Sequence, residues 1–290
     1  MAICIVVYKI NNIKSKYSID TKEIEGIITN IKNDEEKTIL TIKSKENIVG
    51  YYKGDIGLNL GDKVKIVGNL SALSSNTNFN LFSYKKYMLS KNTYYSMNID
   101  NISLIKKNNN IFYKIKTYLV ERISNIKCSE YLNTFILGDS SYISDNVLES
   151  YRTNGISHLF SVSGMHITLL SCLILYILNK VKKRNINYLF VILFLLFYMF
   201  LTNFTPSVMR ATFLFIFLTL NKLLKLNLST VRIFLLILMI NIIINPYNIY
   251  NIGFKFSYII SFYLIIFSKI INRYKSYIVK ILYNIKVIKI

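Results

Sequence analysis

Carboxylates are missing from the second half of this chain. All 15 acidic residues lie between Asp20 and Glu149, whereas 16 of the 36 lysine and arginine residues follow Glu149. The first 149 residues therefore carry 20 − 15 = +5, and the remainder carries 16 − 0 = +16. This absence excludes from the second half any site that uses its own Asp or Glu to bind a metal ion or to orient a catalytic histidine.

Metal-binding and nucleotide-binding patterns are also lacking. Cys4, Cys128 and Cys172 lie far apart without metal-ligand spacing, and Cys172 in an apolar run is predicted to be a small core residue. The two histidines, His158 and His166, do not by themselves make a metal site. The sequence contains no Gly-x4-Gly-Lys-Ser/Thr nucleotide loop. We therefore predict no cofactor, no metal and no enzymatic activity, with any energy source in another protein.

Long apolar runs fill the second half instead. A membrane-spanning helix needs about 20 mostly apolar residues, and five stretches come close to this length. The fold class predicted for this half is therefore a membrane α-helical bundle of about five spans in a lipid bilayer. The expected spans are Leu159–Leu178, Ile186–Thr202, Val208–Leu224, Val231–Ile244 and Ile252–Ile270.

The first half alternates apolar and polar residues as β-strands do. Short alternating runs with glycine turns, such as Gly61-Asp62, predict a small all-β barrel of the OB-like type. The expected strands are Ile24–Ile31, Thr38–Ile42, Ile48–Tyr52, Lys63–Gly68 and Tyr94–Ile105.

Aromatic and basic residues are interleaved in this barrel. OB barrels often bind single-stranded nucleic acid by stacking bases on aromatic rings above a basic groove. The alternative is that the aromatic residues belong to the barrel core and the lysines to a solvated surface, and both interpretations stay open. The residues concerned are Tyr51, Tyr52, Lys53, Phe79, Phe82, Tyr84, Lys85, Lys86 and Tyr87.

Four segments follow from these patterns. Residues 1–21 form an N-terminal segment whose apolar start lacks the charged front of a signal peptide, and which we interpret as the stump of a span. Residues 22–107 form the OB-like β domain, 108–150 an amphipathic helical linker and 151–290 the transmembrane domain. In the linker, a helix over 111–126 is expected to lie on the membrane surface or against the bundle.

The distribution of basic residues predicts the orientation. Basic clusters follow the first, third and fifth expected spans, whereas the connections Asn203–Pro206 and Asn245–Asn251 contain no Lys or Arg. The positive-inside rule places the basic connections in the cytoplasm. We therefore expect a multi-pass protein of the cell membrane with an extracytoplasmic N-terminal domain.

Four motifs in register give the chain a family resemblance that covers roughly residues 22–270. The run His158-Leu-Phe-Ser-Val-Ser-Gly-Met-His166, with Gly155 before it, resembles the signature of the ComEC/Rec-type competence proteins. Leu137-Gly138-Asp139, Pro206-Ser-Val-Met-Arg210-Ala and Gly253-Phe-Lys-Phe-Ser257 resemble further family motifs in the expected order.

The resemblance implies an inner-membrane channel that passes single-stranded transforming DNA into the cytoplasm. It also implies other competence proteins as partners, including an ATP-driven motor, and leaves homo-oligomer formation open. The chain departs from the family because no metallo-β-lactamase-like domain or His-x-His-x-Asp-His motif follows, so we interpret it as truncated. Lys255 also stands where the family usually has glutamine.

The candidate site residues are polar or cationic residues inside apolar runs, which are costly to keep there. Arg210 is compensated by helix carbonyls, by a lipid headgroup to which it snorkels, or by a passing phosphate. The His158–His166 run is either a polar lining of the DNA path or a set of polar contacts that hold helices together. The expected DNA path comprises His158, Ser161, Ser163, Gly164, His166, Arg210 and Lys255, and Gly155, Pro206 and Gly253 are expected to be structural.

Two alternative functions stay open at this point. The first is a membrane-anchored OB-type binding module that does not transport anything. The second is an inactive, truncated member of the competence family. Substitution of Arg210 or His158 distinguishes a channel from an anchor, because only a channel loses uptake while still inserting.

Overall fold

A computed structural model describes most of the 290 residues. The described ranges are 15–33, 37–54, 56–74, 83–138, 143–156, 160, 162–180 and 184–287. Two expected site residues, His158 and Ser161, lie outside them, as does the apolar start of the chain interpreted as a span stump. Phe79, Phe82 and Asp139 also lie outside the described residues.

The chain folds into two compact units, each assembled from separate stretches of sequence. The barrel unit comprises Met1–Val162, Phe200–Thr205 and Ile242–Asn251. The helical unit comprises Ser163–Met199, Pro206–Asn241 and Ile252–Ile290.

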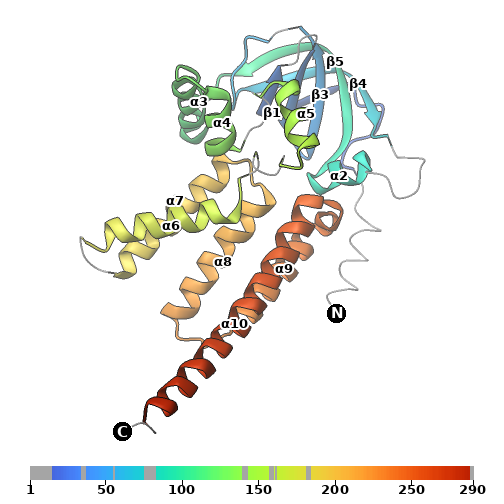
Figure 1. Ribbon diagram of the computed structural model, residues 1–290. Coiled ribbons are helices and arrows are strands. Elements are labelled where there is room, and N and C mark those ends of the chain that lie inside the picture. The colour runs from blue at the N-terminus through green and yellow to red at the C-terminus, as the bar shows by residue number, and fades with distance from the viewer. Residues whose placement is uncertain are drawn as a thin grey trace. The chain divides into compact units, whose positions relative to one another are not determined.

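Five strands of the barrel unit close into a barrel with the strand order β1-β2-β3-β5-β4 (Figure 1). The pairs are antiparallel except for β3 with β5, which run parallel. The predicted small all-β barrel is therefore confirmed, with every expected strand present. The strands are β1 Glu23–Asn33, β2 Lys37–Lys43, β3 Asn47–Lys53, β4 Lys63–Ala72 and β5 Thr93–Lys106.

Alternation along the strands builds the core of the barrel. In β2 and β4, every second residue is buried, as expected where one face of a strand meets the core and the other meets solvent. The buried positions carry branched aliphatic side chains, which favour extended backbone. The core residues are Ile24, Ile28, Leu40, Ile42, Ile48, Val64, Ile66, Leu70, Met97 and Ile99.

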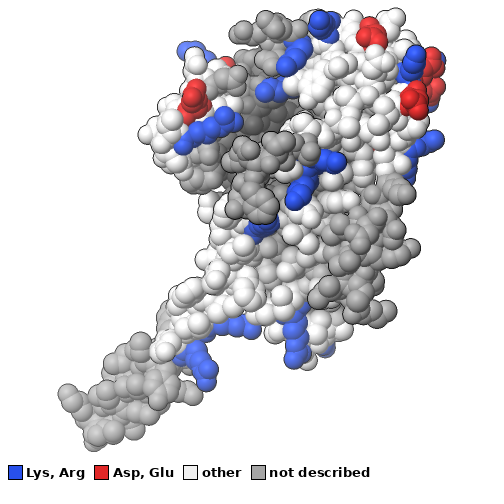
Figure 2. Space-filling model, turned by 90° about the vertical axis from the view of Figure 1, so that its right-hand side faces the viewer, with Lys and Arg blue, Asp and Glu red and all other residues white. Residues whose placement is uncertain are grey.

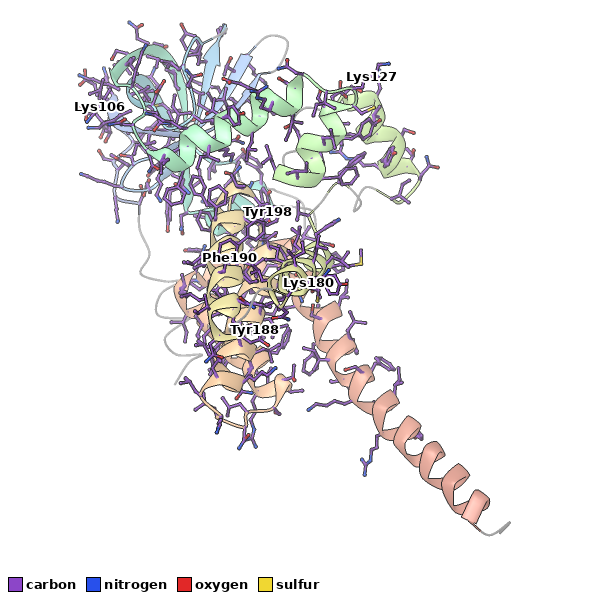
Figure 3. All side chains as sticks on the ribbon, turned by 90° about the vertical axis from the view of Figure 1, so that its left-hand side faces the viewer. Lys106, Lys127, Lys180, Tyr188, Phe190 and Tyr198 are labelled. Carbon is purple, nitrogen blue, oxygen red and sulfur yellow. The ribbon has the colours of Figure 1, made fainter. Side chains whose placement is uncertain are left out.

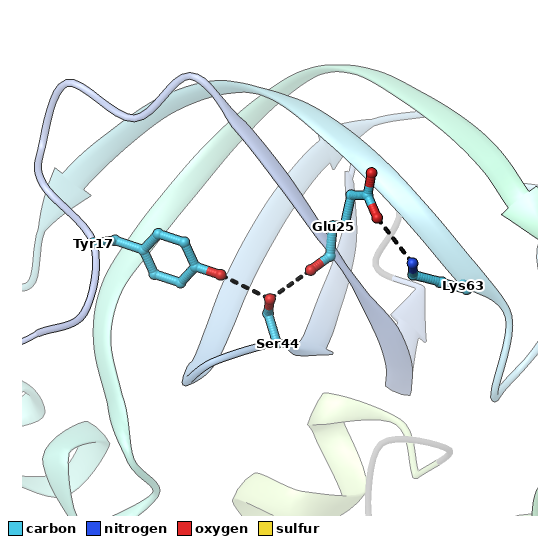
Figure 4. Close-up of polar contacts among 4 residues, drawn as sticks. All are labelled: Tyr17, Glu25, Ser44 and Lys63. Atoms are coloured by element: carbon cyan, nitrogen blue, oxygen red, sulfur yellow. Dashed lines mark hydrogen bonds and ion pairs between the residues drawn. The ribbon is translucent and has the colours of Figure 1, made fainter.

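Polar contacts tie the rim of the barrel together (Figure 4). The Ser44 hydroxyl lies 2.7 Å from the Tyr17 hydroxyl and donates to the backbone carbonyl of Glu25. The Glu25 carboxylate in turn lies 2.9 Å from the Lys63 ammonium on β4, which lowers the pKa of that carboxyl. Since both side chains are exposed, water and salt screen this ion pair, and packing rather than charge stabilises the barrel.

Among the described residues of the barrel unit, four α-helices accompany the barrel. Asn110 caps α3, since its side-chain oxygen accepts a hydrogen bond from the Phe112 amide at 2.9 Å. The helix predicted for 111–126 is therefore present. The helices are α2 Tyr84–Ser90, α3 Ile111–Ser124, α4 Ser129–Leu137 and α5 Asp145–Thr153.

Five further helices build the helical unit, at the positions of the five expected spans (Figure 1). Helix α8 contacts both α6 and α10, and Phe234 of α9 packs its ring against Tyr258 and Phe262 of α10. The helices are α6 Gly164–Leu178, α7 Arg184–Leu201, α8 Pro206–Leu223, α9 Thr230–Ile244 and α10 Ile252–Val287.

The prediction of a bundle of about five spans is wrong. Among the described residues, one helix is long and apolar enough to cross a membrane, over Ile252–Ile271 of α10. Helices α6 and α9 have 15 residues each, or roughly 22 Å at about 1.5 Å per residue, against a hydrocarbon thickness of about 30 Å. The α6 run is shortened because its helix begins at Gly164 and not at Leu159, and α8 carries polar residues in its first and last turns.

Two helix connections belong to the barrel unit and are held there by hydrogen bonds. The Lys116 ammonium of α3 donates to the Asn203 side-chain oxygen at 2.7 Å, between α7 and α8. Between α9 and α10 lies the short helix η3, Pro246–Tyr250. Asn245, just before η3, donates to the Ser90 carbonyl of α2 at 2.8 Å. These are the two connections that carry no lysine or arginine.

Candidate functional site

The start of helix α6 is shaped by a reciprocal contact between two motif residues. Ser163 precedes the helix, and its backbone N–H donates to Nδ1 of His166 at 3.0 Å. The Ser163 hydroxyl lies 3.2 Å from the same nitrogen. Because Nδ1 accepts a hydrogen bond, the proton of the neutral imidazole resides on Nε2, which remains a donor. The pair therefore fixes both the beginning of the helix and the orientation of the ring.

Arg210 of α8 brings its guanidinium to this helix start. A Cβ atom added to Gly164 would lie 2.7 Å from Nη2 of Arg210, which is closer than such atoms approach in proteins. The glycine therefore leaves the space that the guanidinium occupies. On its other side, Nε of Arg210 donates to the Ser257 hydroxyl of α10 at 2.8 Å. Three motifs far apart in the sequence thus meet within the helical unit.

We call Ser163, Gly164, His166, Arg210 and Ser257 the donor cluster. The first N–H groups of a helix lack intrahelical acceptors and carry the positive end of the helix dipole. A guanidinium beside them adds a full positive charge, and no carboxylate follows Glu149 in the sequence to offset it. Such a site favours an anion, and its planar fork of donors suits a phosphate.

A second polar group lies close to the donor cluster in the helical unit. Tyr258, next to Ser257 on α10, has its hydroxyl 3.1 Å from the side-chain nitrogen of buried Asn241 on α9. Asn241 also donates to the Ile237 carbonyl in its own helix at 2.9 Å. Thr212, two residues after Arg210, has a buried hydroxyl without a hydrogen-bond partner. Polar side chains therefore line the faces of α8, α9 and α10 that pack within the unit.

Lys255 is not part of the donor cluster in the structure. Its side chain is exposed, and it lies two residues from Ser257, so the two side chains point about 200° apart around α10. The structure therefore brings Arg210 to Ser257 and leaves Lys255 on another face of the helix.

The three residues expected to be structural lie at helix ends. Pro206 is the first residue of α8, where a missing N–H costs nothing. Gly155 follows α5 with a φ of +70°, the left-handed conformation that ends many helices and that glycine adopts without strain. Gly253 lies in the first turn of α10.

The apolar residues of the His158–His166 motif have a packing role that sequence reasoning missed. Phe160 is buried and contacts the rings of Tyr131, Phe135 and Tyr151 within the barrel unit. Val162, also buried, is the last residue of the motif in this unit. The motif thus runs from a buried aromatic cluster in one unit to the donor cluster in the other.

The aromatic residues of the barrel surface are mainly packing residues. Tyr51, Tyr84 and Tyr87 pack around a small core of Val49, Leu73 and Met88 between the barrel and α2. Burial, together with the hydrogen bond that the Tyr84 hydroxyl shares with that of Tyr51, raises the pKa of the Tyr84 hydroxyl above its usual range. This placement favours the structural interpretation for these tyrosines. Lysines lie over some of their rings, as Lys91 does over Tyr87 at 4.6 Å.

The donor cluster presents hydrogen-bond donors, which suit the binding of an anion. Among the described residues, no group of three or more His, Cys, Asp or Glu side chains could hold a metal ion. Although Ser163 and His166 form a close pair, Nδ1 of His166 accepts the backbone N–H of Ser163. A nucleophile-activating histidine needs a third group to orient it, and the donor cluster supplies further donors instead.

Ser257 is the member of the donor cluster that sequence reasoning did not select. It was visible as the last residue of the motif Gly253-Phe-Lys-Phe-Ser257. A serine in an apolar helix is common, however, since it can bond to its own backbone. Only the fold shows that it meets Arg210, 47 residues away in sequence.

Comparison with solved structures adds no argument. An aspartyl-tRNA synthetase from Entamoeba histolytica aligns with 55% of this chain and 34% of its own, at 7% identity and a TM-score of 0.25. A second aspartyl-tRNA synthetase, from Leishmania major Friedlin, aligns with 40% of this chain and 29% of its own, at 5% identity and a TM-score of 0.23. Scores this low relate neither the folds nor the functions.

Sequence comparison is informative. The ComE operon protein 3 of Bacillus subtilis (strain 168) is 25% identical in an alignment of 223 residues that covers 74% of this chain and 29% of that protein. The chain thus spans less than a third of the length of this relative. The family model described as "Competence protein" matches residues 135–287, which contain the whole donor cluster. That match covers more than half of the chain, which therefore belongs to the Competence protein family.

Proposed function

We propose that this chain is a membrane component of DNA uptake in natural competence and that it passes single-stranded DNA toward the cytoplasm. Membership of the Competence family supports a role in DNA uptake. The donor cluster supports the passage of DNA, because it brings together an arginine, a helix N-terminus and a histidine N–H in a part of the sequence that holds no Asp or Glu. Each nucleotide of DNA presents one anionic phosphate, which these donors suit.

Membrane residence rests on α10. Only 11% of its most apolar window is buried inside the structure, unlike the core helix of a water-soluble protein. An exposed apolar surface of this extent is stable when lipid covers it. The outward apolar side chains include Phe256, Ile260, Leu264, Phe267 and Ile271, each at least 55% exposed.

The surface of the helices agrees with this proposal. On the face shown in Figure 2, red acidic side chains occur on the barrel unit, whereas the helices show a largely uncharged surface with a few blue basic groups. Figure 3 labels Tyr188, Phe190 and Tyr198 along α7, and Phe190 is 55% exposed. A lipid surrounding suits the exposed Phe190 ring better than water does.

We further propose that the barrel unit is extracytoplasmic in the cell membrane. The start of α10 adjoins η3, which belongs to the barrel unit and is fixed there by the bond from Asn245 to Ser90. The other end carries Lys269, Arg273, Lys275 and Lys280, which the positive-inside rule places in the cytoplasm. If α10 crosses the membrane, the barrel unit lies on the outer side. Multi-pass topology beyond α10 stays a prediction.

The remaining partners follow from this role. Transport of a polyanion in one direction requires an energy source, which we expect in a separate ATP-driven motor among the other competence proteins. Of the expected DNA path, His158, Ser161 and Lys255 stay predictions, and so do homo-oligomer formation and contact between the barrel and DNA. We also propose an OB-like domain over residues 22–107, a helical linker over 108–150 and a transmembrane domain over 151–290.

The test is DNA uptake with variants of Arg210. Labelled DNA would be supplied to a channel-deficient strain that expresses this chain at matched membrane levels. We expect wild type to restore uptake and Arg210→Ala to abolish most of it. Arg210→Lys should give an intermediate result, because it keeps the charge but loses the fork of donors. Arg232→Ala, an exposed arginine at the start of α9, is the matched control and should retain uptake.

Two outcomes would change the proposal. Equal uptake by wild type and Arg210→Ala would mean that the helical unit acts as an anchor for the barrel. No uptake by wild type that is present in the membrane would mean that the chain does not conduct DNA without further segments or partners.

A further inference from the structure

Helix α3 shows an apolar stripe to the outside. Ile111, Ile115 and Tyr118 follow one another on α3 at intervals of four and three residues, which places them within about 60° around the helix. Ile126 follows two residues after the end of the helix. The exposed fractions of the four residues are 65%, 37%, 53% and 52%. We call these four residues the α3 stripe. Amphipathic helices normally bury such a stripe, so its exposure needs an explanation.

The opposite face of α3 is fixed against the barrel unit. Lys116 is 4% exposed and donates to Asn203 at 2.7 Å, and Ile123 is 7% exposed. The ring of Tyr113 packs against Phe200 with 5.2 Å between centroids. Rotation of the helix to bury the stripe would break these contacts and expose Ile123. The outward direction of the stripe is therefore set by packing.

Basic side chains surround the α3 stripe. Figure 3 labels Lys106 and Lys127, which flank α3 in the sequence and lie in the barrel unit. From Lys106 to Glu130, and leaving out Lys116 because it is buried on the opposite face, the sequence holds five basic and two acidic residues, a net charge of 5 − 2 = +3. Arg122 lies on the stripe itself and holds its Nε 3.0 Å from the Tyr118 hydroxyl. Such a basic rim is attracted to an anionic surface.

Further exposed apolar residues lie beside α3 and at the end of β5 in the barrel unit. Phe112, 46% exposed, has its ring 5.6 Å from that of Phe200, where α7 ends. Phe200 in turn contacts Phe204, which is 49% exposed. Leu104 and Ile105 at the end of β5 are 42% and 44% exposed. The apolar surface thus extends from α3 to the point where the chain leaves an apolar helix.

We propose that α3 lies in the plane of the membrane surface, with the α3 stripe among the upper acyl chains and its basic neighbours at anionic headgroups. A narrow apolar stripe edged by lysine and arginine fits the boundary between headgroups and acyl chains. Arg122 reaches the headgroups from the stripe, as long cationic side chains do. The inference uses the proposed membrane residence of the chain but does not depend on DNA passage.

The test measures the depth of α3 residues in lipid. Single cysteines would replace Ile111, Ile115 or Ser124 in a chain whose native cysteines are changed to serine, and each would carry an environment-sensitive fluorophore. The full chain would be reconstituted into phosphatidylcholine vesicles with phosphatidylglycerol, with and without brominated acyl chains. Ser124 is the matched control, because it is exposed on α3 about 160° away from the middle of the stripe.

We expect labels at 111 and 115 to emit at shorter wavelength and to lose most of their fluorescence to brominated lipid. The label at position 124 should emit at the longer wavelength typical of water and should not be quenched by brominated lipid. Removal of phosphatidylglycerol should reduce quenching at 111 and 115, since the basic rim loses its anionic partner. Water-like emission at both stripe positions would overturn the proposal. Short-wavelength emission without bromine quenching would also overturn it, because another polypeptide would then cover the stripe.

Discussion

The side chain that Gly164 lacks determines where Arg210 can lie. Any Cβ at position 164 would contact Nη2 of the guanidinium at 2.7 Å. Arg210 is held on its other side by Ser257, so it cannot move aside without losing the bond from Nε. At the residue scale, Gly164 and Ser257 therefore act together, because both position the Arg210 guanidinium beside the N-terminus of α6.

We expect Gly164→Ala to reduce DNA uptake by roughly tenfold or more while the protein still inserts. Displacement of Arg210 costs the phosphate a charge-assisted hydrogen bond of about 1.5–3 kcal/mol, and each 1.4 kcal/mol is about a tenfold change. Uptake at matched membrane levels measures it. Gly253→Ala, in the first turn of α10, should leave uptake close to wild type. Unchanged uptake in Gly164→Ala would show that the guanidinium is not positioned by this contact.

The sequence identified most of the donor cluster because polar residues stand out in apolar runs. Ser163, Gly164, His166 and Arg210 were selected in this way, and the structure brings all four together. Lys255 was selected by the same reasoning but lies on another face of α10. Cationic character alone does not tell which side of a helix packs inward, since that depends on neighbours distant in sequence.

At the scale of elements, periodicity predicted the strands well and the spans badly. Strands β2 and β4 each have one buried and one exposed face, which gives their sequences a period of two residues. An apolar run carries no such mark of where its helix begins. Gly164 opens α6 after Ser163 and thereby leaves a helix of 15 residues where a longer span was expected.

The attachment of η3 to α2 is an element-scale contact that no local pattern shows. Asn245 donates to the Ser90 carbonyl at 2.8 Å, and its side-chain oxygen accepts the Tyr247 amide at 3.0 Å. Asn251, beyond η3, reaches the Ser90 hydroxyl at 3.4 Å. Since Asn245 is 9% exposed, both of its hydrogen bonds are largely shielded from water. It therefore caps η3 and fixes it to the barrel unit at once.

We expect Asn245→Ala to destabilise the barrel unit by about 2–3 kcal/mol, because it leaves a buried carbonyl unpaired and removes a helix cap. Denaturant unfolding of the detergent-solubilised chain, followed by tyrosine circular dichroism, measures the loss. Asn251→Ala is the control and should cost less than about 1 kcal/mol, since its bond is long and less buried. Equal losses in the two variants would contradict the role given to Asn245.

At the scale of the whole molecule, composition predicted a polar half and an apolar, basic half. It did not predict which short segments of the second half belong to the barrel unit. The change near residue 150 is visible because acidic residues stop there. In the structure, Phe200–Thr205 and Ile242–Asn251 nevertheless belong to the barrel unit. The hydrogen bond from Asn245 to Ser90, which holds the second segment there, joins residues 155 positions apart. Contacts at that separation depend on the fold and leave no periodic signal in the sequence.

This arrangement, together with the charge distribution, predicts the orientation of the chain. Asn251 of the barrel unit directly precedes α10 in the chain, and Lys269 and Arg273 lie at the far end of the apolar window, so a crossing by α10 separates the two. Single cysteines at Ser71 on β4 and at Tyr274 near the basic end, both exposed, would be placed in a chain without native cysteines. In intact cells, a membrane-impermeant maleimide should label position 71 and should reach position 274 only after permeabilisation.

The reverse labelling pattern would place the barrel unit in the cytoplasm, against the positive-inside rule. Labelling of both positions in intact cells would mean that α10 does not cross the membrane. The donor cluster could then not pass DNA across it. A reversal caused by replacing Lys269 and Arg273 with glutamine would show that these charges set the orientation. Because the attachment of η3 to α2 is independent of those charges, the barrel unit should stay folded in that variant.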